Sequence, residues 1–139
     1  MSSTTPSDTS QNAESAPGVN HPRATLSPAD DLVIILSNAP DLLLAKRIAH
    51  MLVEEHLAAC VNLGTPGLSM YMWEGALEGA EEIPLTMKTT RARAPALVAR
   101  LVELHPYDVP EVLVLPVSEG SIGYAEWVRS QTLPGQAQP

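Results

Sequence analysis

Three side chains in the sequence could together bind a divalent metal ion: one thiol, one imidazole and one carboxylate. They belong to Cys60, His105 and Glu111. Copper and zinc favour thiolate and imidazole ligands, and copper has the highest affinity among the divalent first-row metals. Because the three residues are far apart along the chain, only the fold could bring them together. Their chemistry alone makes them the predicted metal ligands.

Two of these residues also have a structural interpretation, which the sequence leaves open. Cys60 lies in the apolar segment 57–61, and a buried free cysteine commonly behaves as a small hydrophobic side chain. His105 ends a predicted helix, where a histidine is favourable at the negative end of the helix dipole. A strong metal site needs three or four ligands at a recognisable spacing, and no CxxC, HxxxH or HExxH pattern occurs. We therefore expect any metal binding to be weak.

Lys88, Tyr107 and Trp73 form a second candidate set, which suits a small ligand in a cleft. Lys88 is isolated in an otherwise neutral strand. Projecting into a cleft between subunits beside Tyr107 and Glu111, its ammonium group would contact a small anion or a carboxylate. The alternative is that Lys88 extends to the surface along its aliphatic stem. Glutamates also cluster at 74–82, and although hard cations favour carboxylates, such a cluster at a turn is commonly just solvated.

The sequence contains none of the motifs that identify common enzyme sites. It has no glycine-rich phosphate loop and no GxSxG nucleophile elbow. The segment 37–40, which would form the first loop, lacks the arginine that an acylphosphatase-like phosphate cradle requires. We therefore predict that the protein is not an enzyme and requires no cofactor. Cu(II) or another divalent cation is the one inorganic ligand that we expect.

The composition restricts the partners and the location of the protein. The formal net charge is -8, whereas binding to a nucleic-acid backbone needs a surplus of Lys and Arg on one face. A single cysteine excludes an intramolecular disulfide. The N-terminus lacks the basic start and apolar run of a signal peptide, and no run reaches transmembrane length. We predict a cytoplasmic protein with no nucleic-acid partner and no membrane association.

One domain of ordinary size accounts for the 139 residues and their hydrophobic content of 45%. Residues 1–30 are rich in small polar residues and proline and hold few large apolar side chains. Because such a segment cannot offset the entropy that is lost on ordering, we predict a disordered N-terminal tail there. Residues 31–132 form the predicted domain, and residues 133–139 form a short C-terminal tail.

Hydrophobic periodicity within this domain alternates between strand and helix patterns. The predicted elements are a strand at 31–37, a helix at 41–55, a long β-hairpin at 57–90, a helix at 90–105, a strand at 111–117 and a short helix after Ser121. This order predicts an α+β fold. It is a ferredoxin-like βαββαβ sandwich, with a four-stranded antiparallel sheet, two helices on one face and an additional C-terminal helix.

The long hairpin is the central element of this domain, and its outgoing arm is apolar on both faces. Every second side chain of a strand shares a face, which gives one face Leu68, Met70 and Met72 and the other Ser69, Tyr71 and Trp73. Soluble monomers rarely expose contiguous apolar patches of this size, so a second copy of the chain is the economical cover. We predict an interface between identical chains that contains Tyr71, Trp73, Met70 and Met72.

Glycine and proline interrupt both arms of the hairpin. An unbroken arm from 57 to 73 would span more than about 50 Å at the usual rise of a strand, so the Gly and Pro residues at 64–67 are predicted to bend or bulge it. Pro84 lies in the returning arm at 81–90 and cannot donate a ladder hydrogen bond, which predicts a bulge or an unpaired edge. The turn between the arms is predicted at 74–79.

The motifs in and after this hairpin resemble those of the CutA family, the divalent-cation tolerance proteins. The resemblance covers about residues 32–129 and is carried by Ala58, Ala59, Cys60, Val61, Asn62, Pro66, Gly67, Ser69, Tyr71, Trp73, Glu74, Gly75, Lys88, Thr89, His105, Pro106, Tyr107, Val109, Pro110, Glu111, Leu115, Pro116 and Val117. It implies a ferredoxin-like subunit in a compact homotrimer whose hairpins pair across subunits. It also implies a cytoplasmic role linked to copper and other divalent metals.

One departure from the family pattern bears on metal binding. Some bacterial relatives have a cysteine, implicated in copper binding, at the end of the first strand, where this chain has Ser37. Our main hypothesis is a trimeric cytoplasmic protein of divalent metal tolerance that binds metal ions weakly through Cys60, His105 and Glu111. The alternatives are a regulatory trimer resembling the PII signalling proteins, with a metabolite in the cleft between subunits, and a structural hub that presents its tails to a partner.

Overall fold

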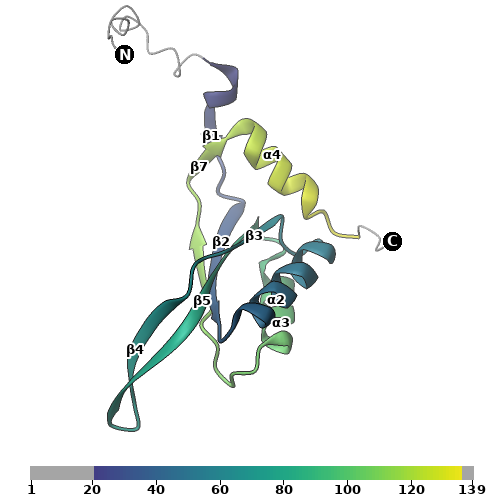
Figure 1. The fold of residues 1–139 in the computed structure, drawn as a ribbon. Helices are drawn as coiled ribbons and strands as arrows, with labels where there is room; N and C mark the ends of the chain where they lie inside the picture. The colour runs from purple at the N-terminus through teal and green to yellow at the C-terminus, as the bar shows by residue number, and fades with distance from the viewer. Residues whose placement is uncertain (1–20, 136–139) are drawn as a thin grey trace, which may run out of the picture.

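An antiparallel sheet with the strand order β3-β5-β2-β6 organises residues 21–135, which the computed structural model describes (Figure 1). In chain order the elements are the 3₁₀ helix η3 (Pro22–Ala24), β1 (Leu26–Pro28), β2 (Leu32–Ala39), α2 (Leu42–Glu54), β3 (Cys60–Leu63), β4 (Gly67–Trp73), β5 (Ala76–Thr90), α3 (Ala94–Leu104), β6 (Leu113–Pro116), β7 (Glu119–Ser121) and α4 (Ile122–Gln131). The order from β2 to β6 is βαββαβ, because β3 and β4 are two parts of one arm. The predicted α+β, ferredoxin-like fold is confirmed.

The helix α2 forms where the sequence provides both a cap and an apolar stripe. The side chain of Asp41 accepts a hydrogen bond from the backbone amide of Leu44 at 2.8 Å, which satisfies one of the free amides of the first turn. Ala45, Ile48 and Leu52 are buried at spacings of three and four residues, so they lie on one side of the helix. This stripe turns α2 toward the sheet.

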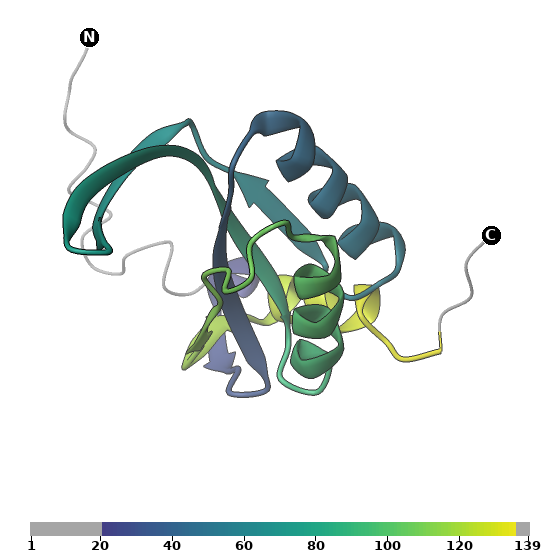
Figure 2. The ribbon, with the colours of Figure 1, turned by 90° about the horizontal axis from the view of Figure 1, so that it is seen from below.

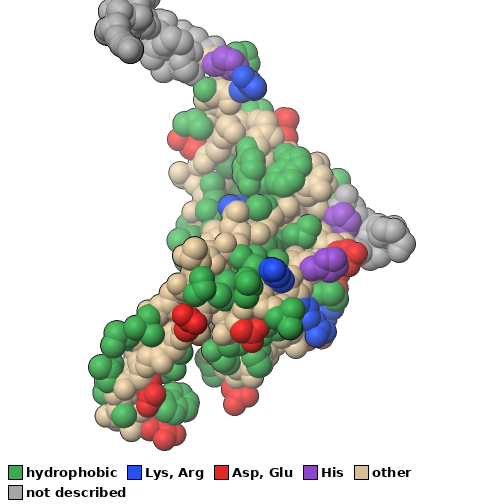
Figure 3. Space-filling model, viewed as in Figure 1, with side chains coloured by type: hydrophobic (Ala, Val, Ile, Leu, Met, Phe, Trp, Pro, Cys, Tyr) green, Lys and Arg blue, Asp and Glu red, His purple; other side chains and the backbone are tan. Residues whose placement is uncertain are grey.

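The hairpin formed by β4 and β5 projects from the body of the domain and curves away from it (Figures 1 and 2). The predicted alternation of its side chains is confirmed by the pairing of β4 with β5. Met70 is 61% exposed on one face and Trp73 is 61% exposed on the other. The space-filling view shows hydrophobic and acidic side chains together along this arm (Figure 3). Among residues 21–135, no segment covers either face of the outer part of the hairpin.

A bulge separates β3 from β4, as the glycine and proline residues predicted. Leu63 pairs with Leu85 and Gly67 pairs with Glu82, so three residues of one arm lie opposite two of the other. The Pro84 carbonyl accepts a hydrogen bond from the Gly64 amide at 2.9 Å. In an antiparallel sheet the carbonyl and the nitrogen of one residue point toward the same neighbouring strand. The amide hydrogen that Pro84 lacks would therefore point toward the bulge, and the pairing of β5 with β2 loses no hydrogen bond.

The turn of the hairpin is shorter than the predicted 74–79. Only Glu74 and Gly75 lie between the paired residues Trp73 and Ala76, and both have positive φ, 50° and 83°. Two such residues form the tight turn whose twist matches that of the strands, and glycine tolerates this conformation at little cost. The glutamates after this turn are therefore strand residues, and the register of β4 with β5 determines on which face of the hairpin each of their side chains lies.

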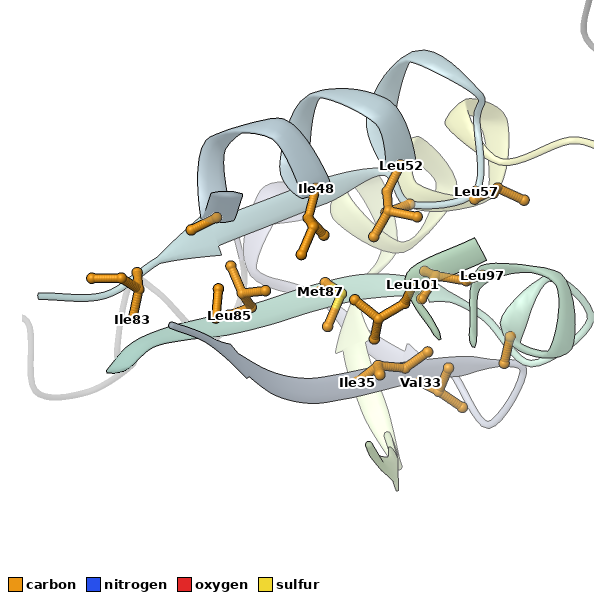
Figure 4. Packing of buried hydrophobic residues seen from close by; sticks show 14 residues of the cluster. Val33, Ile35, Ile48, Leu52, Leu57, Ile83, Leu85, Met87, Leu97 and Leu101 are labelled. Carbon is orange, nitrogen blue, oxygen red and sulfur yellow. The ribbon is translucent and has the colours of Figure 1, made fainter. Parts of the chain in front are cut away.

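The core lies between α2, α3 and the central strands β2 and β5 (Figure 4). Alternate residues of β5 from Ile83 to Thr89 are buried. Figure 4 shows the helix residues directed onto the strand residues, here Ile48, Leu52, Leu97 and Leu101 onto Ile35, Leu85 and Met87. Complete burial of one such side chain contributes about 1.5–3 kcal/mol. This layer holds β2 and β5 in place beneath the hairpin.

In the described part of the chain, the opposite face of the sheet is covered at one end only. There α4 packs on the sheet in a second buried cluster, which consists of Ala29, Leu32, Ala59, Ala125 and Val128. Leu113 and Leu115 of β6 lie opposite Leu36 and Ile34 on this same face, and they are 55% and 40% exposed. The sheet therefore continues the uncovered apolar surface of the hairpin.

The N-terminal segment differs from the predicted tail over its last ten residues. The strand β1 pairs with β7, Ala29 is completely buried, and Asp31 forms an ion pair with Arg129 of α4 at 2.6 Å. The prediction of disorder was wrong for this part, because the segment finds an edge strand to pair with and a small apolar site for one alanine. Residues 1–20 and 136–139 of the predicted tails lie outside the described residues.

Candidate functional site

A cavity of about 890 Å³ lies between the hairpin and the loop that follows α3. Its walls come from the end of β2, from β4 and β5, and from the loop at 107–111. The residues that line it are Asn38, Ser69, Met70, Tyr71, Trp73, Glu78, Glu82, Tyr107, Asp108, Val109, Pro110 and Glu111. The volume is within the range of sites for small ligands.

The hairpin contributes mainly the face of Ser69, Tyr71 and Trp73 to this cavity, and Met70 of the other face also lines it. Trp73 and Tyr71 are two residues apart on β4, and the register places Tyr71 directly opposite Glu78. Glu82 is four residues further along β5, on the same face as Glu78 because side chains alternate along a strand. The aromatic rings and the carboxylates therefore follow one line from the tip of the hairpin toward its base.

Hydrogen bonds join the loop after α3 to the end of β2 and to the hairpin. Asn38 Nδ2 donates to Glu111 Oε1 at 2.7 Å, and the Asn38 carbonyl accepts from His105 Nε2 at 2.7 Å. The backbone amide of Tyr107 donates to His105 Nδ1 at 3.2 Å, while its hydroxyl donates to Glu82 Oε2 at 3.1 Å. These bonds fix the base of the cavity.

His105 supports this loop from behind. Its Nδ1 accepts from an amide, so the ring proton of the neutral imidazole lies on Nε2, which donates to the Asn38 carbonyl. The side chain is buried, with 7% of its surface exposed. A metal ion would have to displace one of the two hydrogen bonds in order to bind His105. Within one chain the structural interpretation therefore accounts for both of its nitrogens.

Tyr107 is a hydrogen-bond donor to the cavity wall. Burial raises the pKa of its hydroxyl above the ordinary value, and the hydrogen bond to the Glu82 carboxylate raises it further. Deprotonation would remove the donor and place two negative charges side by side. At neutral pH the hydroxyl keeps its proton and holds one oxygen of Glu82.

Cys60 and Lys88 lie outside the cavity, on the part of the sheet beyond the bulge. They are paired directly opposite each other in β3 and β5. The Lys88 ammonium group donates a hydrogen bond to Asn62 Oδ1, and the Cys60 thiol lies 3.7 Å from the same oxygen. Of the predicted ligand-binding set, Tyr107 and Trp73 share the cavity, and Lys88 is separate from them within one chain.

The three predicted metal ligands do not converge within one chain. Glu111 lines the cavity and His105 lies behind it, at the level of Asn38 of β2. Cys60 pairs with Lys88 of β5, which in turn pairs with Ile34 of β2. Ile34 is four residues, or roughly 13 Å, along β2 from Asn38. Within residues 21–135 no group of three or more His, Cys, Asp or Glu side chains is placed to hold a metal ion. One chain alone offers no complete site from these residues.

Several cavity residues were missed in the sequence: Asn38, Glu78, Glu82 and Asp108. The glutamates were interpreted as a solvated cluster because the turn was predicted to be too long. A two-residue turn at Glu74 and Gly75 gives β5 its register, and the register then places two of the glutamates beside Tyr71. The Glu74-Gly75 pair is the signal in the sequence that could have located this turn.

The charges that line the cavity all have the same sign. It is lined by four carboxylates and by the aromatic rings of Tyr71, Trp73 and Tyr107, and none of its lining residues in the described part of the chain is Lys, Arg or His. Carboxylates attract cations, and aromatic faces add to that attraction when a cation lies over the ring. The geometry suits a positively charged ligand.

The fold and the cavity define a class of small α+β proteins, in which a ferredoxin-like sheet extends into a long hairpin beside a cation-attracting cleft. The chain belongs to the CutA family, since the model of the CutA1 divalent ion tolerance protein matches residues 33–131. A relative named divalent-cation tolerance protein CutA from Pectobacterium atrosepticum is 45% identical over 103 residues, which cover 74% of this chain and 94% of that protein. The relative of the same name from Thermus thermophilus is 45% identical over 100 residues, with 71% and 96% covered.

Solved structures of the same family share the fold. CutA from Synechococcus elongatus has a TM-score of 0.78 and 35% identity, covering 81% of this chain and all of that one. The CutA protein of Archaeoglobus fulgidus, which is named as periplasmic, has a TM-score of 0.71 and 31% identity, with 73% and 99% covered. These names describe cation tolerance and no catalytic activity. In the part of the chain that the structure describes, no helix is long and apolar enough to cross a bilayer.

Proposed function

We propose that the protein is a homotrimeric divalent-cation tolerance protein that binds divalent ions weakly and catalyses no reaction. The observation that carries the binding part is the cavity, which has four carboxylates in its lining. The family supports the same conclusion through the names of its members. Weak binding follows from the spread of these carboxylates, because strong sites bring at least three ligands to one point.

The chemistry of the ligands divides the candidate ions into two groups. Carboxylate oxygens suit hard ions such as Mg²⁺, Ca²⁺ or Mn²⁺, whereas Cu(II) favours imidazole and thiolate. We assign Glu111 to the weak binding of hard ions in the cavity. We propose Cys60 and His105 as the copper ligands, in sites that neighbouring chains of the assembled trimer complete.

Calorimetric titration of the full chain with Mn²⁺ and with Cu(II) tests this assignment. We expect both isotherms to saturate, Glu111→Gln to weaken Mn²⁺ binding several-fold, and Cys60→Ala to weaken only the binding of Cu(II). Glu119→Gln in β7 is the matched control, because it removes the same charge from a residue that does not line the cavity. Identical isotherms for Glu111→Gln and Glu119→Gln would exclude Glu111 from the site.

The trimeric state is supported by the apolar side chains that the single chain leaves uncovered. Met70 and Met72 on one face of the hairpin, and Tyr71 and Trp73 on the other, are all exposed. Large aromatic side chains such as those of Tyr71 and Trp73 are typical anchors of protein interfaces. Light scattering at micromolar concentration should give the mass of about three chains. A stable monomer at that concentration would contradict the proposal.

A cytoplasmic location is part of the same proposal. Its support is the single cysteine, which is unpaired, since disulfides are typical of proteins in oxidising compartments. Fractionation of cells that produce the protein should recover it with cytoplasmic markers. Recovery with periplasmic markers would contradict this and would agree with the name of the Archaeoglobus fulgidus relative.

A regulatory binding module is the second candidate function, and the size of the cavity favours it. About 890 Å³ is more space than a metal ion fills and is enough for a small metabolite. A ligand that binds only the folded protein raises its melting temperature. Thermal-shift screening of small amines, nucleotides and small acids separates this function from metal tolerance, because the tolerance protein should respond to divalent ions alone among these compounds. The carboxylates of the lining favour the amines over the two anionic classes.

A further inference from the structure

We propose that the N-terminal segment 25–31, which we call the strap, latches α4 in place as a lid over the end of the sheet that carries Cys60. Opening of this lid is a local event that leaves the rest of the domain folded. The strap precedes the family match, which begins at residue 33. Access to Cys60 is what the lid controls, and only the copper-binding role of that thiol rests on the proposed function.

The helix α4 gains little from its own contacts with the sheet. Its buried residues are Ala125 and Val128, whereas α2 buries three residues that include Ile48 and Leu52. Because the stabilisation follows the apolar area that is buried, α4 is held much less firmly than α2. A helix of ten residues is also too short to be stable in isolation. Other contacts must therefore keep α4 on the sheet.

The strap supplies backbone contacts at the start of α4. The strand β1 pairs with β7, which leads directly into the helix (Figure 1). The Thr25 carbonyl accepts a hydrogen bond from the Ile122 amide at 3.1 Å, and the Ala29 amide donates to the Ser118 carbonyl at 3.0 Å. The N-cap residue of α4, Ser121, makes no capping bond with its side chain. The strap therefore satisfies a first-turn amide that the helix itself leaves free.

One alanine of the strap is completely buried under α4. Ala29 belongs to the same apolar cluster as Ala125 and Val128 of the helix. A Cβ atom placed on Gly120 of β7 would lie 3.9 Å from the Cβ atoms of both Ala29 and Ala125, so the strap, β7 and the helix are closely packed at this point. The contact lies within one chain, and burial there does not depend on the assembly.

An ion pair fastens the strap to the last turn of α4. Arg129 Nε donates to Asp31 Oδ2 at 2.6 Å, and Arg129 Nη2 donates to Asp31 Oδ1 at 2.9 Å. Two parallel bonds of this kind fix the orientation of both groups. The Asp31 carbonyl accepts a hydrogen bond from the Arg91 amide at 2.7 Å, directly after β5. The strap therefore connects both ends of α4 to the sheet.

The helix lies over the part of the sheet that carries Cys60. Ala59 is buried in the cluster beneath α4. Val61 and Leu63 of β3 pack on the opposite, core side, so the alternation of a strand places Cys60 on the face of α4. Burial raises the pKa of Tyr124, and the charge of the Cys60 thiolate raises it further, as expected for neighbouring side chains. Opening of the lid withdraws Tyr124 from Cys60.

Amide hydrogen exchange of the full chain tests the latch. Ala29→Glu places a carboxylate in a closely packed apolar site, so it should displace the strap. We expect the amides of α4 to exchange at least about tenfold faster in this variant, and those of α2 to keep their wild-type rates. Asp31→Asn removes the ion pair and leaves the packing intact, so it should accelerate the exchange of α4 by about threefold.

Two exposed residues provide matched controls. Ala24→Glu introduces the same charge into η3, which contains no buried residue, and Asp30→Asn removes the same charge beside the ion pair. Both should change the exchange of α4 by less than about twofold. Equal acceleration of α2 and α4 in Ala29→Glu and in Asp31→Asn would show global destabilisation, and unchanged exchange of α4 in both would show that the strap does not hold it. Either result would overturn the proposal.

Alkylation of Cys60 by iodoacetamide measures what the lid covers. Cys60 is the single cysteine of the chain, so the reaction reports on one site. We expect it to accelerate in Ala29→Glu about as much as the exchange of α4 does, and to keep the wild-type rate in Ala24→Glu. Light scattering on each variant verifies that its assembly is unchanged. An unchanged alkylation rate beside faster exchange of α4 would overturn the lid over Cys60. Neither readout uses a metal ion, so failure of this proposal and failure of the copper assignment are distinguishable.

Discussion

His105 connects the end of α3, the end of β2 and the loop that borders the cavity. Replacing His105 by alanine should destabilise the protein by about 2–3 kcal/mol, because it leaves a small void and removes the partners of a carbonyl and an amide. Urea-induced unfolding at a fixed protein concentration measures this. His50→Ala is the control: its side chain is exposed and lies 3.1 Å from the carboxylate of Glu54, so its cost should be below about 0.5 kcal/mol. Equal costs would refute the supporting role of His105.

The raised pKa of Tyr107 makes a prediction for alkaline pH. The folded state holds the phenol proton more tightly than the unfolded state, so the contribution of this proton to stability is complete below the unfolded pKa of about 10. It is lost as the pH rises through the higher folded value. The wild type should therefore lose stability more steeply above pH 10 than Tyr107→Phe, as measured by urea unfolding in a pH series. Parallel pH profiles would show that neither burial nor the Glu82 contact raises the pKa of Tyr107 in the folded state.

The bulge between β3 and β4 depends on the fit between a glycine and a proline. A Cβ atom at Gly64 would lie 3.1 Å from Pro84 Cγ, whereas a Cβ at Gly67 would meet nothing within 4 Å. Gly64→Ala should cost about 1 kcal/mol, and Gly67→Ala should be neutral or slightly stabilising. Thermal unfolding measures both.

The contact itself is tested by combining two substitutions. If the proline ring causes the cost of Gly64→Ala, that cost should fall in the background of Pro84→Ala, where the ring atoms are absent. A double-mutant cycle gives the coupling free energy. An unchanged cost in both backgrounds would place the strain elsewhere in the bulge.

The order and type of the elements were predictable because their patterns are local. The apolar run of β2, the Asp41 cap of α2 and the glycine and proline residues of the bulge each identify their own structure. The N-terminal strand was not predictable, because β1 has little apolar character of its own and is ordered by a partner more than ninety residues later. Local propensity does not contain such long-range pairing.

The candidate site was predictable only in part for a related reason. Tyr107, Trp73 and Glu111 were identified by their chemistry, and the structure brings them to one cavity. Cys60 and Lys88 were equally suitable by type, but the register of β3 with β5 places them beyond the bulge. Position along a sheet is set by pairing over the whole domain, and a single sequence does not show that pairing.

The proposed trimer predicts which surface controls assembly. Met70→Glu/Met72→Glu places two charges on the hairpin face that we expect to be buried between chains, so it should shift the mass from about three chains to one. Leu43→Glu/Leu42→Glu on α2 is the matched control: these side chains are 80% and 49% exposed and lie on a helix that is not part of the hairpin. Light scattering and sedimentation measure the mass. A trimer that tolerates the methionine changes would place the interface elsewhere.

The strand β5 runs without a break from the turn at Ala76 to Thr90, although its partner arm is interrupted. Its first half borders the cavity and its second half carries Leu85 and Met87 into the core. The backbone amides of one strand therefore span the proposed ligand site and the interior of the domain. Deuterium uptake measured amide by amide along β5 would form a gradient, in which the outer half slows when a ligand or a neighbouring chain binds and the inner half serves as a built-in reference.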